Sequence, residues 1–460
     1  MDMYDAIIIG TGQSGPALAR RLAKVGQKIA AVERKFFGGT CVNTGCTPTK
    51  TLVASAYAAH MARRAGDYGI TISGSISVDM KAVKARKDAV ALASRRYVER
   101  SLKTLEGCTV YEGQAQFVAP NEVAVGDSLL RGDRIFINVG GRALVPPISG
   151  LNDVPYLTNS SMMDVDFLPP HLIVLGGSYI GLEFAQMYRR FGSDVTVIEL
   201  APRLIAREDE DVSRAVADFL QEEGIDIRVA SKVVGVEKQG NRTAVSIESA
   251  GRLSQVVGTH LLVAIGRQPN TDDLGLDKAG VTTDPHGYIE VDDELRTNVD
   301  GIWALGDCNG RGAFTHTSYN DFEIVAANLL DNERRRVTDR ITAYALYTDP
   351  PLGRVGMTEA EVRKSGRPAM ISITQMEDVS RAYERGETKG FMKILVDRDS
   401  GLILGAAFLG LSGDEVIHAM IDAMYAKTPC TVLQQGPCTS IPRFRSHSDD
   451  ARQPPAVAMI

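Results

Sequence analysis

A glycine-rich turn between an apolar strand and a helical stretch occurs twice in this chain. The first copy is Gly10-x-Gly12-x-x-Gly15, which directly follows the run DAIIIG. A short, almost continuously apolar run of this kind is typical of a strand buried on both faces of a parallel sheet. After the helical stretch, a second apolar run (KIAAVE) ends at Glu33. The pattern predicts a strand–helix–strand unit with a glycine turn at the helix N-terminus.

The second copy is Gly176-x-Ser178-x-x-Gly181, which follows HLIVLG, and its next strand (DVTVIE) ends at Glu199. The interval from the first glycine to the acidic residue is 23 residues in both copies. Such turns let the backbone approach a pyrophosphate, and the acidic residue accepts hydrogen bonds from ribose hydroxyls. Two strand–helix units without nucleotide are the alternative, but the repeated spacing favours two dinucleotide sites.

Composition narrows the class of protein. At roughly 150 residues per domain, 460 residues predict about three domains. The net charge of −6 gives no reason to expect nucleic acid or an anionic membrane as a partner. No apolar run reaches the roughly 18 residues of a membrane span, and the N-terminus lacks a secretion signal. Six cysteines are too few for a disulfide scaffold. We therefore expect a cytoplasmic globular protein.

A pair of cysteines follows the first acidic strand in the segment CVNTGCTPTK, which begins at Cys41. We expect Thr47 to cap a long helix and Pro48 to be its first residue, which places Cys46 at the helix N-terminus. That position and Lys50, one turn further on, both lower a thiol pKa. A zinc site would need two more ligands at metal spacing, which the sequence lacks. Two unrelated structural cysteines are the other alternative; a redox-active dithiol is the favoured interpretation.

These features together resemble the flavin-dependent pyridine nucleotide–disulfide oxidoreductases, the family of dihydrolipoamide dehydrogenase, glutathione reductase and mercuric reductase. The resemblance also includes GGSYIGLE, VAIGR and Gly306-Asp307, and the wording of CVNTGCTPTK and GDCNGRGAFTHTSYND is most similar to the mercuric-reductase-like branch. It implies an α/β fold with two Rossmann-like dinucleotide-binding domains, for FAD and NAD(P), and an α+β C-terminal dimerisation domain. The implied boundaries are 1–150 with 271–340 for FAD, 151–270 for NAD(P), and 341–428 for dimerisation.

The resemblance implies a role for individual residues. FAD would lie on the first turn, with Lys50 near the flavin N5 and paired with Glu183, Cys46 against the flavin ring, and Cys41 as the thiol that exchanges with substrate. The other FAD residues would be Gly10, Gly12, Gly15, Glu33, Gly39, Thr40, Gly113 and Asp307. No resident metal is expected.

The nicotinamide nucleotide would bind the second turn. Its residues would be Gly176, Ser178, Gly181, Glu199 and Gly266, with Tyr179 as the aromatic side chain that covers the pocket until the cosubstrate enters. Glu199 should repel a 2′-phosphate and favour NADH, whereas Arg203 and Arg207 just beyond it would favour NADPH. We predict NADH, with NADPH as the alternative.

The C-terminal end departs from the family, which completes its site with a histidine before a proline, followed by a glutamate, from the partner subunit. None of the seven histidines here stands in that context, and residues 429–460 hold 5 of the 19 prolines, which predicts an unstructured tail. QGPCTSIP, from Gln435, can be back-translated so that another frame reads Arg-Ala-Met-His-Ile-His-Pro. This suggests the hypothesis of a frameshift near Gln434 or Gln435; a divergent tail is the alternative.

The resulting functional hypothesis is a relay from NAD(P)H through FAD to a Cys41–Cys46 disulfide in a homodimer, with turnover of a small disulfide or dithiol impaired by the missing base. Two alternatives remain open. One is mercuric reduction, although the chain opens directly with the FAD strand and lacks the adjacent C-terminal cysteines of those enzymes. The other is a flavin-loaded protein that is inactive or acts in sensing.

Overall fold

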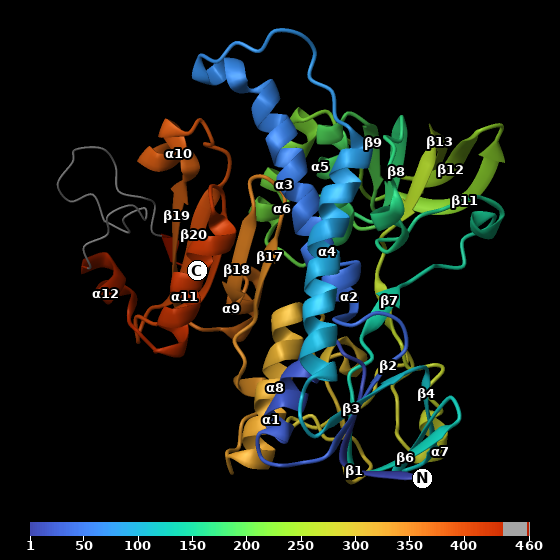
Figure 1. Cartoon of the computed structure of the whole chain (residues 1–460). Helices are drawn as coiled ribbons and strands as arrows, with labels where there is room; N and C mark the ends of the chain where they lie inside the picture. Colours follow the sequence, from blue (N-terminus) through green and yellow to red (C-terminus); the bar gives the residue numbers. More distant parts are fainter. Residues whose placement is uncertain (436–457, 460) are drawn as a thin grey trace.

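The computed structural model describes residues 1–435 and 458–459. Its first sheet has the order β3-β2-β1-β6-β5-β4, with β16 beside β6 (Figure 1). Strands β1, β2, β3, β6 and β16 are parallel, and β4 and β5 form an antiparallel extension. The bounds are β1 Asp2–Ile9, β2 Ile29–Glu33, β3 Cys108–Glu112, β4 Ala115–Ala119, β5 Glu122–Val125, β6 Ser128–Ile137 and β16 Ile302–Ala304.

Helices α1 (Ser14–Ala23) and α8 (Thr315–Leu330) cover one face of this sheet, where Leu18 and Ile324 share a buried cluster with Ile8. The short α7 (Leu276–Ala279) packs on the other face, with Ile7. Helices α3 (Cys46–Arg63) and α4 (Met80–Lys103) lie side by side, and α2 (Gly39–Asn43) precedes them (Figure 1). The central strand β1 ends at Ile9 and leads directly into the first glycine turn, and α2 lies next to that turn.

The start of α3 differs from the prediction. The predicted cap at Thr47 is wrong, because the helix begins at Cys46 with Gly45 as its N-cap, and the Thr49 amide donates to the Gly45 carbonyl at 3.0 Å. Pro48 is tolerated in the third helical position because no amide of the first turn has an intrahelical partner. The predicted placement of Cys46 at the helix N-terminus is confirmed.

The second sheet is parallel, in the order β10-β9-β8-β14, and a three-stranded antiparallel sheet β11-β12-β13 packs against one face. Helices α5 (Tyr179–Phe191) and α6 (Glu210–Glu222) cover the other face. The strands are β8 His171–Leu175, β9 Asp194–Ile198, β10 Asp226–Arg228, β11 Lys232–Gln239, β12 Arg242–Ser249, β13 Arg252–Gly258 and β14 His260–Val263. The small pair β7 (Gly141–Ala143) and β15 (Arg267–Pro269) joins the two connections between this unit and the first sheet.

The third sheet is built from the C-terminal part of the chain, in the order β17-β18-β21-β20-β19-β22. Its strands are β17 Ala343–Leu346, β18 Leu352–Gly356, β19 Ala369–Gln375, β20 Phe391–Asp397, β21 Ile403–Leu409 and β22 Ala458–Met459. Its helices are α9 Glu359–Ser365, α10 Ser380–Glu384, α11 Gly413–Tyr425 and α12 Cys430–Gln435. Leu346, Leu352 and Leu409 of this sheet belong to the same buried cluster as α5 and α6. The unit that carries the second glycine turn, built from the second sheet with α5 and α6 and called the nucleotide unit below, therefore shares a buried cluster with the C-terminal sheet.

The predicted α/β fold class is confirmed, with an antiparallel C-terminal sheet. The predicted unstructured tail is wrong at its start, because α12 forms where the Cys430 amide donates to the Gly401 carbonyl at 2.9 Å and Leu433 packs against the C-terminal core. The prediction is also wrong at Ala458–Met459, where β22 pairs with β19. Residues 436–457 and 460, which hold most of the frameshift segment, lie outside the described residues, and the domain boundaries remain a prediction. Within the described part of the chain, no helix is long and apolar enough to cross a membrane.

Candidate active site

Both glycine turns are packed too tightly for a larger residue. A Cβ on Gly10 (φ +100°) would lie 2.3 Å from the Asn138 carbonyl oxygen, and one on Gly176 (φ +111°) would lie 2.4 Å from that of Ala264. At the third position of each motif, a Cβ would lie 2.4 Å from the first glycine's carbonyl oxygen in the first copy and 2.0 Å in the second. Only glycine fits at these positions, and glycine turns of this kind let a backbone approach a pyrophosphate closely.

The two acidic residues after these turns occupy equivalent positions. The Glu33 carboxylate accepts hydrogen bonds from the amides of Thr11 (3.1 Å) and Lys35 (2.9 Å). The Glu199 carboxylate accepts them from Gly177 (2.6 Å) and Ala201 (2.7 Å). In each copy the donors are the residue after the first glycine and the second residue after the glutamate. The repeat predicted from the sequence therefore extends to the hydrogen bonds of the two sites.

The remaining predicted FAD residues gather around the first turn. A Cβ on Gly39 would lie 2.9 Å from Gly12 Cα, so α2 abuts the turn, and Thr40 is the next residue of α2. The Gly113 amide donates to the Glu33 carbonyl at 2.9 Å, and the Asp307 carboxylate pairs with Arg267 at 3.2 Å. Asp307 and Arg267 line a cleft of about 700 Å³. Gly39 therefore joins α2 to the first turn and Gly113 is bonded to the end of β2, whereas Asp307 faces the cleft.

The second turn brings fewer of its predicted partners together. Ser178, the N-cap of α5, is exposed, and Tyr179 is the first residue of that helix. The Gly266 carbonyl accepts a hydrogen bond from the Leu144 amide at 3.0 Å, after the end of β14. Arg203 donates from Nη2 to the backbone carbonyls of Ala206 and Glu208, whereas its buried Nε has no hydrogen-bond partner among the described residues.

The two cysteines are free thiols that interact with each other. The hydrogen bond from Cys41 lowers the pKa of Cys46 to about 6; burial opposes this, while the Thr315 hydroxyl and the Lys50 charge also lower it. The Thr315 hydroxyl lies 2.9 Å from the Cys46 sulfur. The same bond to Cys46, together with burial, raises the pKa of Cys41. Cys46 is therefore the thiolate of the pair at neutral pH, and Cys41 carries the proton.

Lys50 and Glu183 form the predicted pair. The Lys50 ammonium donates to both carboxylate oxygens at 2.9 Å, and the buried carboxylate also accepts the Tyr347 amide at 3.0 Å. The ammonium lies 4.1 Å from the centre of the Tyr347 ring. Because α3, α5 and the loop after β17 meet at this pair, the cation next to Cys46 is fixed by three elements.

Several site residues were not found from the sequence. Thr315 contacts Cys46 from the start of α8, and Glu208 accepts hydrogen bonds from Tyr179 (3.0 Å) and Tyr344 (2.6 Å). The run GDCNGRGAFTHTSYND, which contains Thr315, is part of the family resemblance. The contact between Thr315 and Cys46 joins positions 269 residues apart, so no local pattern predicts it. Among the described residues, the two thiols hydrogen-bond to each other and to Thr315, and no hydrogen bond to a histidine is found.

Comparison with known proteins identifies the family to which this chain belongs. Residues 4–321 match the pyridine nucleotide-disulphide oxidoreductase family, and residues 342–444 match its dimerisation domain. The chain is 36% identical over 442 residues to a probable pyridine nucleotide-disulfide oxidoreductase, RclA of Escherichia coli, covering 94% of this chain and 95% of that protein. It is 33% identical over 437 residues to a mercuric reductase of Streptomyces lividans, covering 94% and 91%.

The solved structure of HOCl-induced flavoprotein disulfide reductase RclA from Escherichia coli superposes with a TM-score of 0.87 at 34% identity, covering 95% of this chain and 97% of that one. A Cu(II) complex of the same protein superposes with a TM-score of 0.86. This chain is a member of the pyridine nucleotide-disulfide oxidoreductase family of flavoproteins.

Proposed function

We propose that this protein is an FAD-dependent NADH:disulfide oxidoreductase with Cys41 and Cys46 as its redox pair. The observation that carries the proposal is the asymmetric dithiol beside two glycine turns, in which Cys46 has a pKa of about 6 and Cys41 keeps its proton. The overall reaction consumes NADH, a proton and a disulfide, and it yields NAD⁺ and two thiols. Bound FAD would supply the hydride acceptor between the nucleotide and the cysteines.

Different residues would serve different steps of the proposed reaction. The amides of the first turn and α2 would hold the FAD pyrophosphate, with Glu33 at the adenosine ribose and Asp307 at the flavin side. Lys50, held by Glu183, supplies a fixed positive charge that stabilises the Cys46 thiolate. Cys41 is the thiol that attacks the substrate disulfide once it has lost its proton.

We propose NADH as the reductant. The Glu199 carboxylate lies directly after β9, where the nucleotide ribose would bind, and a 2′-phosphate placed there would meet a like charge. One amino group of Arg203 is held by backbone carbonyls, and Arg207 lines the cleft, so Arg207 is the arginine of this loop more readily available to NADPH.

The lack of a histidine in the family's context would limit turnover with disulfides. We propose that NADH reduces the protein rapidly, whereas turnover with disulfides is slow, because no histidine of the sequence has the family's context. A homodimer would use the C-terminal sheet, which matches the family's dimerisation domain.

A second candidate is reduction of a thiophilic metal ion at the cysteine pair. The observation that favours it is the Cu(II) complex of RclA, together with the similarity to mercuric reductases. Paired thiolates bind soft and borderline ions such as Hg²⁺ and Cu²⁺.

Assays of NADH oxidation by the FAD-loaded protein separate the candidates. The substrates are lipoamide, glutathione disulfide, Hg²⁺ and Cu²⁺, each tested with the wild type and Cys41→Ser. Slow disulfide turnover that Cys41→Ser abolishes supports the proposal. Turnover with metal ions alone supports the second candidate, and silence with every substrate supports an inactive or sensing flavoprotein.

A further inference from the structure

Glu208 is a buried carboxylate at the junction of the nucleotide unit and the C-terminal sheet, and its side chain is 0% exposed. One oxygen, Oε1, accepts hydrogen bonds from the Tyr179 hydroxyl at 3.0 Å and the Tyr344 hydroxyl at 2.6 Å. Tyr179 begins α5 directly after the second glycine turn, and Tyr344 lies on β17. A single carboxylate oxygen therefore holds one phenol from each unit.

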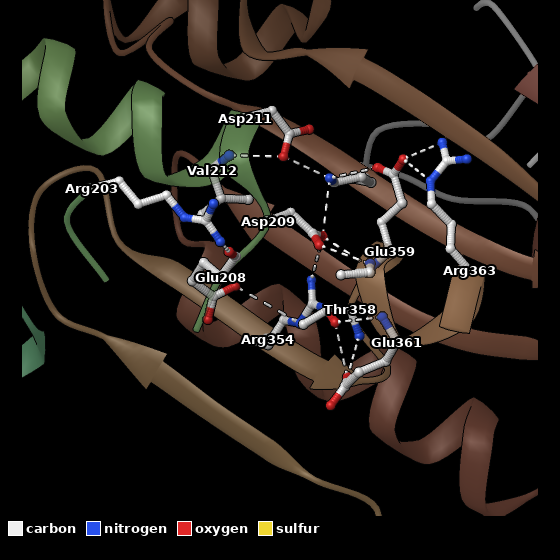
Figure 2. A network of polar contacts seen from close by, with 12 residues as sticks. Arg203, Glu208, Asp209, Asp211, Val212, Arg354, Thr358, Glu359, Glu361 and Arg363 are labelled. Atoms are coloured by element: carbon white, nitrogen blue, oxygen red, sulfur yellow. Dashed lines mark hydrogen bonds and ion pairs between the residues drawn. The ribbon is translucent and has the colours of Figure 1, made fainter. Parts of the chain in front are cut away.

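The other oxygen of Glu208 faces a buried cation. Its Oε2 lies 4.0 Å from Arg354 Nε, and neither atom has a hydrogen-bond partner among the described residues. Figure 2 shows the surrounding network, with Arg354, Asp209, Asp211 and Glu359 labelled. The second buried cation, Lys393, pairs with these three carboxylates, and Arg354 pairs with Asp209. Three carboxylates besides Glu208 thus compensate two cations, so neutralising Glu208 does not leave a buried positive charge alone.

The two phenols are the donors in this arrangement. Burial, and then the nearby Glu208 charge, raise the pKa of both Tyr179 and Tyr344, so each keeps its proton. The Tyr179 ring packs edge-on against Phe314 (centroids 6.2 Å apart) and Tyr344 (5.5 Å). The Tyr344 hydroxyl also interacts with that of Tyr179, and the bond to the Glu208 carboxylate is the charged hydrogen bond that directs the Tyr179 hydroxyl.

We propose that Glu208 is a positioning residue that holds Tyr179 over the nicotinamide pocket in the nucleotide-free protein, in competition with Tyr344 for the same oxygen. The inference rests on the proposed function and on the role that the family resemblance implies for Tyr179 as the side chain that covers that pocket. The nucleotide must break one bond to Glu208, while Tyr344 and Arg354 continue to partner the carboxylate. Because the open form is the minor one, Glu208 lowers the apparent affinity for the nucleotide.

Equilibrium titration of the FAD-loaded protein with NAD⁺, and separately with NADP⁺, tests the proposal. Glutamine at this position keeps the size of the side chain but accepts a weaker, uncharged hydrogen bond. We expect Glu208→Gln to bind NAD⁺ about threefold to tenfold more tightly, because the closed form loses its stabilisation. Tyr344→Phe leaves Oε1 to Tyr179 alone, so it should change the Kd in the opposite direction.

A double-mutant cycle separates positioning from a general structural role. In a Tyr179→Phe background the hydroxyl is absent, so adding Glu208→Gln should leave the Kd unchanged. Weaker binding on adding Glu208→Gln in both backgrounds would overturn the proposal, as would an unchanged Kd in all single variants. If Glu208→Gln does not fold, the opposite shifts expected for Tyr179→Phe and Tyr344→Phe decide the question. A wild type that binds neither nucleotide would overturn the proposed function, and this inference with it.

Discussion

At the scale of single residues, the chemistry depends on a difference between two neighbouring thiols. Cys46 accepts a hydrogen bond from Cys41, lies beside the Thr315 hydroxyl, and begins a helix. Each of these contacts stabilises the thiolate. The sequence predicted the helix terminus and Lys50, but it could not predict Thr315, because that contact depends on how α8 packs beside α3.

Thr315→Val tests the hydroxyl at nearly constant volume. Losing this hydrogen bond should raise the Cys46 pKa from about 6 by about one unit, so the thiolate would form at a higher pH. The measurement is the thiolate absorbance of the reduced protein against pH, with Cys46→Ser as the blank. Thr317→Val is the control, because Thr317 lies two residues further on and its hydroxyl donates to the Phe314 carbonyl instead. An unshifted midpoint in Thr315→Val would contradict the role of the Thr315 hydroxyl.

Glu199→Ala tests the choice of reductant. Removing the carboxylate should raise kcat/KM with NADPH relative to NADH by about tenfold, which corresponds to about 1.4 kcal/mol of relieved repulsion. Steady-state kinetics with both nucleotides measure the ratio. Glu33→Ala, at the equivalent position of the first turn, should instead weaken FAD retention and leave the NADPH/NADH ratio unchanged. If the Glu199 variant keeps the wild-type ratio, the carboxylate does not set the preference.

At the scale of elements, local patterns predicted much of the fold. The two strand–helix–strand units with their glycine turns were found because each has apolar strands and turn residues of its own. The errors at Thr47 and α12 have a different cause. Gly45 and the Gly401 carbonyl supply backbone partners from outside the helical pattern, and no local pattern reports them.

The junction between α6 and the C-terminal sheet depends on buried charges. Asp209 pairs with Lys393 at 3.1 Å and Arg354 at 3.5 Å, and these cations lower the pKa of its carboxyl against the effect of burial. Asp209→Asn should lower the free energy of unfolding by about 3 kcal/mol, since two buried cations lose a partner. Glu210→Gln, which removes an exposed ion pair with Arg214, is the matched control. Denaturant unfolding that gives the same midpoint for both variants would contradict this view of the junction.

At the scale of the whole molecule, the proposed relay assigns its two half-reactions to different residues. The nucleotide half would depend on the second turn, Tyr179 and Glu199, and the disulfide half on Cys41 and on a base, for which no histidine of the sequence has the family's context. The family resemblance correctly identified the class of protein from the sequence. The physiological substrate is not encoded in any of these motifs, because a cysteine pair can in general react with many disulfides and bind many thiophilic ions.

The most direct test of the relay is a thiol count during anaerobic reduction of the oxidised, FAD-loaded protein by NADH. We predict that the flavin bleaches only briefly and that two further thiols per chain become titratable, since one disulfide yields two thiols. In Cys46→Ser the flavin should bleach and stay bleached with no change in the thiol count. Wild-type flavin that is reduced by NADH while the number of thiols stays constant would contradict electron transfer to Cys41 and Cys46.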